Sequence, residues 1–272
     1  MQLQDKRAHG ITPGLSIDYS KRIADKQAAF LLPYLKSGMN LIDIGCGPGT
    51  ITVGLAQAVK PGRVIGIDHD KKHIEEAKKI ASNKNIDNVT FQIGDVLSLK
   101  LDNDSVDAAF ENNVFTHLSK NSLKVAKEIF RVLKPGGFFA ARDVEVNSVL
   151  WGNYNAAIKL LDKLFIKWHI SRGSNITIGS KLPVILREAG FINTIKSVSA
   201  DTKGNLEETR SHAEITVALL EGPFGRDILN KGWADKKTID YLKKSIIEWG
   251  EHPDSFFSNI HVEVIGWKPG LN

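Results

Sequence analysis

Apolar and polar positions alternate along the first half of the chain in a regular succession of strand-like and helix-like runs. After a helical stretch over 16–35, strands are predicted over 39–44, 63–68, 89–94, 106–111 and 137–144, and helices over 50–59, 71–83 and 119–133. Strands that alternate with helices form right-handed βαβ units, which build a parallel sheet covered on both faces. The pattern therefore predicts an α/β fold with a doubly wound, mostly parallel sheet.

The rhythm changes after Asp143, where longer helical stretches come between the later strands. The pattern predicts helices over about 150–170 and 178–189, a strand in "FINTIKSVSA", mostly helical sequence over 205–250, and a final alternating strand in "NIHVEVIGW". We expect a single domain over 1–272 with a seven-stranded sheet. Its core would span 15–144, helical cap segments would span 145–185 and 202–256, and the final strand would span 259–267.

The composition is that of a globular protein, and it narrows the cellular setting. The chain has 272 residues, of which 42% are hydrophobic and 25% charged. Its single cysteine, Cys46, excludes a disulfide framework, and neither a secretory leader nor a membrane-spanning apolar run is present in the sequence. We therefore expect a cytoplasmic protein without stable membrane insertion. The net charge of +5 comes from lysines interspersed with acids, so no nucleic-acid partner is expected, and the oligomeric state stays open.

The stretch "LIDIGCGPGT" at 41–50 carries the strongest chemical signal. The chain must turn sharply between the strand that ends at Ile44 and the helix that begins at Thr50, and Gly45, Gly47 and Gly49 expose backbone amides there. The next strand ends in Asp68, where a carboxylate can accept both hydroxyls of a ribose. A nucleoside ligand is therefore predicted. A dinucleotide is disfavoured, because its G-x-G-x-x-G pattern would place the third glycine one residue later.

Four motifs in order carry a family resemblance. They are "IDIGCGPGT", "VIGIDHD", "FQIGDV" and "EIFRVLKPGG". Together they resemble the class I methyltransferases that use S-adenosylmethionine, specifically the group related to the ubiquinone and menaquinone biosynthesis methylases. The resemblance covers residues 15–144 and implies a Rossmann-like fold with S-adenosylmethionine as the cofactor.

The resemblance also implies a set of cofactor-binding residues. They are Tyr19, Asp43, Gly45, Gly47, Asp68, His69, Asp95, Val96 and Asn112. In such a site the two glycines would lie against the methionine part, Asp43 would reach its ammonium through water, and Asp68 would hold the ribose. His69, Asp95 and Val96 would form the adenine pocket. Tyr19 would belong to a helix that folds over the cofactor, and Asn112 would lie beside the transferred methyl group.

We expect in-line transfer of the methyl group to the oxygen, nitrogen or carbon of a small organic acceptor, with alignment as the main contribution of the enzyme. His117, just after the fourth strand, is the candidate general base. No metal is expected: "HDKKH" at 69–73 imitates a zinc motif but lacks a third ligand, and we expect His73 to be solvated. The alternatives left open are a non-catalytic S-adenosylmethionine-binding sensor or assembly protein, an RNA or protein methyltransferase, and a nicotinamide oxidoreductase.

Overall fold

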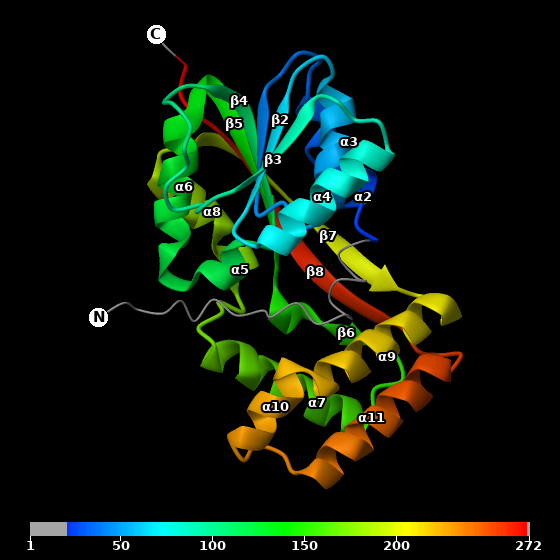
Figure 1. Ribbon diagram of the computed structural model, residues 1–272. Coiled ribbons are helices and arrows are strands. Elements are labelled where there is room, and N and C mark those ends of the chain that lie inside the picture. The colour runs from blue at the N-terminus through cyan, green and yellow to red at the C-terminus, as the bar shows by residue number, and fades with distance from the viewer. Residues whose placement is uncertain (1–20, 271–272) are drawn as a thin grey trace. The chain divides into compact units, whose positions relative to one another are not determined.

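A computed structural model describes residues 21–270, which form parts of two compact units. Of the described residues, the first unit, here called the core unit, contains 21–144, 177–199 and 261–270, and the second, the helical unit, contains 145–176 and 200–260. Both are seen in Figure 1. That the whole chain makes one domain stays a prediction.

The fold prediction is confirmed, with one more strand than expected. The strands are β1 (Leu41–Ile44), β2 (Val64–Asp68), β3 (Val89–Ile93), β4 (Val106–Asn112), β5 (Leu133–Val144), β6 (Leu150–Trp151), β7 (Ile192–Lys203) and β8 (Phe257–Trp267). They form one sheet in the order β3-β2-β1-β4-β5-β8-β6, with β7 also paired to β8. The first five run parallel, whereas β8 is antiparallel to β5. The additional strand is β6, which has two residues, too few to give an alternating pattern in the sequence.

Local signals set most helices of the core unit. These are α2 (Ala24–Gln27), α3 (Thr50–Val59), α4 (Lys71–Asn83), α5 (Phe115–Leu118), α6 (Ser122–Val132) and α8 (Ile178–Ala189), with 3-10 turns at Leu32–Tyr34 and Ser119–Asn121. Helix α4 begins after its N-cap, Asp70, whose side chain accepts a hydrogen bond from the Lys72 amide at 2.7 Å.

The predicted helix over 16–35 is wrong within the described residues. Only α2, with four residues, and the short turn Leu32–Tyr34 form there. Pro33 lies in that turn and lacks the amide hydrogen that a continuing helix needs.

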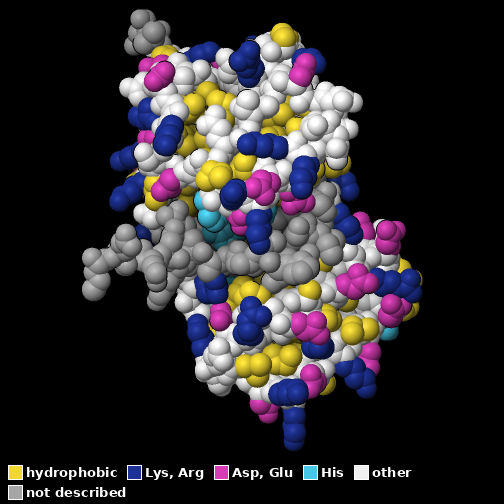
Figure 2. All heavy atoms as spheres, in the orientation of Figure 1, with side chains coloured by type: hydrophobic (Ala, Val, Ile, Leu, Met, Phe, Trp, Pro, Cys, Tyr) yellow, Lys and Arg dark blue, Asp and Glu magenta, His cyan; other side chains and the backbone are white. Residues whose placement is uncertain are grey.

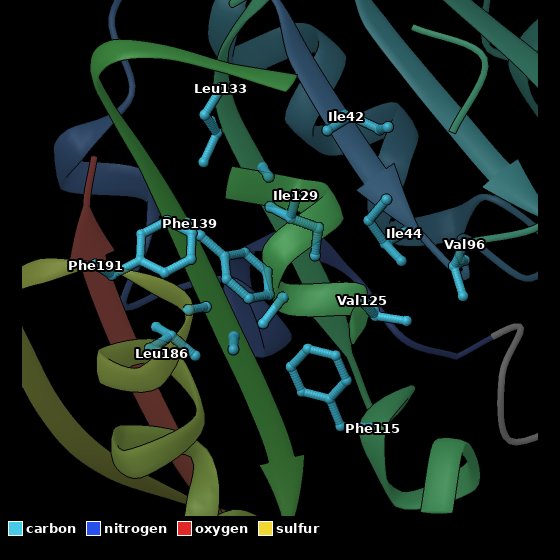
Figure 3. Packing of buried hydrophobic residues seen from close by; sticks show 14 of the residues in the cluster. Ile42, Ile44, Val96, Phe115, Val125, Ile129, Leu133, Phe139, Leu186 and Phe191 are labelled. Carbon is cyan, nitrogen blue, oxygen red and sulfur yellow. The ribbon is translucent and has the colours of Figure 1, made fainter. Parts of the chain in front are cut away.

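Each face of the sheet in the core unit has its own apolar layer. On one face, Ile44 and Phe139 pack with Ile129 of α6 and Leu186 of α8, as Figure 3 shows. On the other face, Phe110 lies in a cluster that includes Leu55 of α3 and Ala28. Successive residues of a strand point to opposite faces. The side chains of the polar residues at the strand ends therefore point toward one or the other of these two faces.

The helical unit has a separate core. The helices of this unit are η3 (Val146–Ser148), α7 (Ala156–Ser171), α9 (Leu206–Glu221), α10 (Pro223–Asn230) and α11 (Lys236–Glu251). Trp168 and Trp249 are buried in its apolar cluster, and their indole N–H groups donate to Asp227 Oδ2 and the Gly152 carbonyl, both at 2.8 Å. Within residues 21–270, no helix is both long and apolar enough to cross a membrane. Basic and acidic side chains are interspersed over the face seen in Figure 2.

Candidate functional site

The glycine turn between β1 and α3 leaves an open space above one glycine. Gly45, Gly47 and Gly49 have φ angles of 67°, 53° and 78°, which side-chain-bearing residues rarely adopt. A Cβ atom on Gly45 would lie 2.5 Å from Val114 Cγ2, and one on Gly49 would lie 2.7 Å from Ala77 Cβ. At Gly47 a Cβ atom would have no neighbour within 4 Å among residues 21–270. The outer two glycines thus permit close packing, whereas Gly47 exposes its backbone to open space.

Asp68 ends β2 beside this turn. Its Oδ2 accepts the Gly47 amide at 2.9 Å, and its Oδ1 accepts the Asp70 amide at 2.8 Å. His69 Nδ1 and His73 Nδ1 lie 3.3 and 3.6 Å from Oδ1. Burial raises the pKa of Asp68, but the hydrogen bonds from His69, His73 and the Asp70 amide outweigh it and hold that pKa well below its usual range. The site therefore keeps an ionised carboxylate at neutral pH.

The expectation that His73 is solvated is wrong. Its side chain is 13% exposed, because the first turn of α4 returns it to the end of β2. Burial lowers the pKa of His73, but the hydrogen bond to Asp68 and the charge of that carboxylate together raise it. The sequence signal was available: a residue five positions after Asp68 lies in the helix that begins at Lys71. His69, by contrast, has a side chain that is 70% exposed.

Asp43 lies in the interior of the core unit at the end of β1. It is 3% exposed, and its Oδ2 accepts a hydrogen bond from Thr52 Oγ1 at 2.6 Å. Burial raises the pKa of Asp43 to about 7, against the hydrogen bond from Thr52. The carboxyl group thus joins β1 to the first turn of α3. Its predicted water-mediated contact with the cofactor ammonium stays a prediction.

The predicted adenine contacts follow β3. Asp95 is exposed, and its Oδ1 accepts the Leu97 amide at 3.0 Å, while its carbonyl accepts the Ser98 amide at 3.0 Å. Val96 is buried and contributes to the apolar layer shown in Figure 3. Their adenine contacts stay predictions. Tyr19, predicted to cover the cofactor, lies outside the described residues.

Asn112 and His117 lie at and beyond the end of β4. Asn112 is half-buried, and its Oδ1 accepts a hydrogen bond from Arg142 Nη1 at 2.9 Å. His117 is an exposed residue of α5, and its backbone amide donates to the Val114 carbonyl at 3.0 Å. The register of β4 with β1 and β5 brings Asn112 to the same edge of the sheet as the glycine turn.

Sequence reasoning missed two buried acids that brace the loop after β4. Glu111 and Asp143 have no exposed surface. Glu111 Oε2 accepts the Val114 amide at 3.0 Å, and Asp143 Oδ2 accepts the Thr116 amide at 2.9 Å. Burial raises the pKa of both carboxyl groups, that of Asp143 to about 7, and the charge of Asp143 adds to the effect on Glu111. No sequence pattern indicated that these strand-end acids would be buried.

The ends of β1, β2, β3 and β4 thus place the predicted residues along one edge of a doubly wound sheet, where ligands of such folds bind. Among residues 21–270, no three histidine, cysteine, aspartate or glutamate side chains group as metal ligands. The described part of the site contains backbone amides, carboxylates, the Asn112 side chain and the histidines beside Asp68.

The chain belongs to a family described as a methyltransferase domain, whose sequence profile matches residues 35–190. It is 29% identical over 269 residues to a probable methyltransferase, ltbC, of Aspergillus luteorubrus, covering 91% of this chain and 92% of that relative. It is also 29% identical to the demethylmenaquinone methyltransferase of Lactococcus lactis, covering 57% of this chain and 67% of the relative. The fold is similar to that of the YcgJ protein of Bacillus subtilis, with a TM-score of 0.61 and 18% identity over 90% of this chain and 99% of that one.

These comparisons confirm that the protein is an enzyme, a class I methyltransferase that depends on S-adenosylmethionine.

Proposed function

We propose that the protein holds S-adenosylmethionine along the ends of β1, β2, β3 and β4 and transfers its methyl group to a small organic acceptor. The observation that carries this proposal is the joining of Gly47 and Asp68. The Gly47 amide fixes an ionised carboxylate at 2.9 Å, next to a space that no side chain of the described part of the chain fills. This arrangement suits a ligand with a diol, whose hydroxyls the carboxylate can accept, and with an extended chain that lies against the Gly47 backbone.

Asp68 has the capacity to hold a ribose as well as its present partners. A carboxylate offers about four lone-pair positions, and the two backbone amides use one on each oxygen. One position on each oxygen can then accept a ribose hydroxyl, with the flanking histidines adjusting to it. His69, Asp95 and Val96 would surround the adenine, Tyr19 would cover the cofactor, and Gly45, Gly47, Asp43 and Asn112 would lie along its methionine end.

When bound, the cofactor supplies a methyl group on a positively charged sulfur, which is already an activated leaving group. The residues of the chain then have to align the acceptor, exclude water and, where the acceptor must lose a proton, remove it. His117 is the residue we propose for that proton, because its exposed ring belongs to the helix that follows β4 directly. We further propose that the reaction needs no metal and takes place in the cytoplasm.

The proposal is tested with S-adenosylmethionine labelled in its methyl group. The full chain is incubated with the labelled cofactor and a cellular extract, and the small-molecule and macromolecular fractions are separated and analysed by mass spectrometry. We expect a labelled small molecule that is absent when Asp68→Ala replaces the wild type. Label that enters only protein or RNA would contradict the small-molecule acceptor. No label in either fraction, with cofactor binding intact, would instead indicate a non-catalytic binding protein.

A further inference from the structure

A row of polar side chains crosses four neighbouring strands of the core unit at the end of the sheet where Asn112 lies. Asn112 of β4 pairs in register with Arg142 of β5, which in turn pairs with Glu263 of β8. Strand β7, also beside β8 in Figure 1, adds Ser197 and Ser199. Arg142 and Glu263 are 1% and 4% exposed, so the centre of the row lies in the interior.

Arg142 is the centre of this row. Its Nη1 donates to Asn112 Oδ1 at 2.9 Å, and its Nε donates to Ser199 Oγ at 3.0 Å. Glu263 Oε1 lies 3.6 Å from the same Nε, while Glu263 Oε2 accepts a hydrogen bond from Ser197 Oγ at 2.6 Å. A buried arginine that meets a carboxylate and two polar oxygens is fixed in position.

This contact determines which way the Asn112 amide faces. A guanidinium group has five N–H donors, no acceptor, and a charge that it keeps at every physiological pH. The oxygen of Asn112 must therefore face Arg142, and its NH2 group must face away. Within residues 21–270 no acceptor lies within hydrogen-bond distance of that NH2 group, although Asn112 is half-buried. Such a half-buried donor pair can donate to solvent or to a ligand that displaces the solvent.

We propose that Asn112 donates its amide N–H to an oxyanion of the acceptor, so that the enzyme methylates a phenolate or enolate and not an amine. This inference rests on the proposed function, which places Asn112 beside the transferred methyl group. An oxyanion has three lone pairs: one can attack the methyl carbon, or feed electrons to a neighbouring carbon that attacks, while another accepts the N–H of Asn112.

An amine does not suit the same side chain. Its nitrogen has a single lone pair, which must attack the methyl carbon, so its N–H groups need hydrogen-bond acceptors. Asn112 Oδ1 already accepts from Arg142 and has one lone pair left, so it could accept at most one of them, and the two N–H donors of Asn112 would find no acceptor on the amine.

Methylation of a hydroxyl acceptor requires the loss of its proton. The O–H proton leaves to a base, an oxygen lone pair forms the new bond to the methyl carbon, and the carbon–sulfur bond breaks with its electron pair on sulfur. The products are the methyl ether, neutral S-adenosylhomocysteine and one proton. For an enolate the new bond forms at carbon, and Asn112 holds the oxygen.

The first arm of the test identifies the methylated atom. The labelled product that wild type forms in the extract is isolated, and its structure is solved by NMR and mass spectrometry. A methyl group on oxygen, or on the carbon next to an enol or phenol carbon, is expected. A methyl group on an amine nitrogen would overturn the inference and leave the proposed function intact, whereas a complete lack of labelled product would count against both.

The second arm uses Asn112→Asp, which has nearly the same shape and keeps a partner for Arg142 but loses both N–H donors. With the identified acceptor, single-turnover transfer should fall roughly 10- to 100-fold, as expected for loss of a hydrogen bond to a charged oxygen. Affinity for S-adenosylmethionine and S-adenosylhomocysteine is measured on the same variant, so that a slower transfer at saturating cofactor is distinguished from weaker binding. Asn83→Asp makes the same change on the exposed side of α4 and should leave transfer unchanged.

The outcomes of the second arm separate two roles of Asn112. Wild-type transfer by Asn112→Asp would refute a contact with the acceptor. Weaker cofactor binding with an unchanged rate at saturation would also refute it, and would assign the amide to the cofactor. Thermal denaturation checks the fold, and Asn112→Ser, which restores one hydroxyl donor, should recover part of the lost rate.

Discussion

The backbone amide of Gly47 donates a hydrogen bond to Oδ2 of Asp68 at 2.9 Å, across 21 positions of sequence. The contact joins the turn after β1 to the end of β2, so the two strongest sequence signals are parts of one structure. It also places an ionised carboxylate and an exposed backbone together, which is the arrangement that a nucleoside cofactor requires.

Two glycines of the turn should respond differently to the same substitution. Gly45→Ala places Cβ 2.5 Å from Val114 Cγ2 at a φ of 67°, and we expect it to lower the free energy of unfolding by roughly 2 to 4 kcal/mol. Gly47→Ala meets no neighbour in the described structure, so it should cost only about 1 to 2 kcal/mol of backbone strain but weaken cofactor binding, because its methyl group enters the open space. Urea denaturation and calorimetric titration of both variants check this. Equal losses of stability would contradict the packing described for Gly45.

The pairing of His73 with Asp68 predicts a shifted histidine titration. The pKa of His73 is raised by its hydrogen bond to Asp68 and by the charge of that carboxylate, against the effect of burial. Asp68→Asn removes the charge and should lower the pKa of His73, as measured from its imidazole NMR signals across pH 5 to 9. Asp87→Asn, which removes an exposed carboxylate, is the control. An unchanged His73 titration in Asp68→Asn would show that the two side chains do not pair in solution.

The raised pKa of Asp43 predicts how the free energy of unfolding depends on pH. Burial raises its pKa from 3.8 to about 7, so between these values the folded protein keeps a proton that the unfolded chain loses. This stabilisation is complete below about pH 4 and is lost as the pH rises through 7, with a slope of up to about 1.4 kcal/mol per pH unit. Glu111 and Asp143 act in the same direction.

Urea denaturation at pH 5, 6 and 7 without cofactor measures this slope. Asp43→Asn cannot take up the proton, and its stability should fall less steeply with pH than that of the wild type. Asp87→Asn should keep most of the wild-type slope. If Asp43→Asn follows the wild-type curve, the carboxyl group of Asp43 is ionised throughout and its burial has been misjudged.

His117 predicts a rate effect that depends on the acceptor. If the acceptor must lose a proton, His117→Ala should lower single-turnover methyl transfer by about 10² to 10⁴, and the acidic limb of the pH profile should disappear. Cofactor affinity should stay the same. Lys120→Ala, in the neighbouring 3-10 turn, is the control. A fall of less than about fivefold with an unchanged profile would remove His117 from the proton transfer.

Local patterns predicted much of the fold. The predicted bounds of α3, α4 and α8 agree with Thr50–Val59, Lys71–Asn83 and Ile178–Ala189, because caps and apolar spacing along one segment determine them. The helix over 16–35 failed in its described part, where Pro33 interrupts it. The two-residue β6 depends on pairing with β8, which no local pattern contains.

The candidate site likewise has parts that local sequence predicts and parts that depend on pairing between distant strands. Asp68 and the glycine turn are adjacent to strand ends, so their proximity follows from parallel topology. The row from Asn112 to Glu263 depends on register between strands far apart in sequence. Glu263 in particular belongs to an alternating strand, whose polar positions suggest a solvated face, yet it is 4% exposed and lies against Arg142. Sequence alone could not show that β7 pairs with β8 and brings Ser197 and Ser199 to this row.

The central claim is that Asp68 holds the ribose of the cofactor, and calorimetric titration of Asp68→Asn tests it most directly. The variant keeps an oxygen for the Gly47 amide but loses the charge, and the matched control Asp70→Asn loses a charge two positions later while remaining a good N-cap. S-adenosylmethionine and S-adenosylhomocysteine share the ribose, so both should bind Asp68→Asn roughly 10- to 150-fold more weakly, equivalent to about 1.5 to 3 kcal/mol, while Asp70→Asn binds them nearly as the wild type does. Wild-type affinity of Asp68→Asn for both ligands would contradict the account.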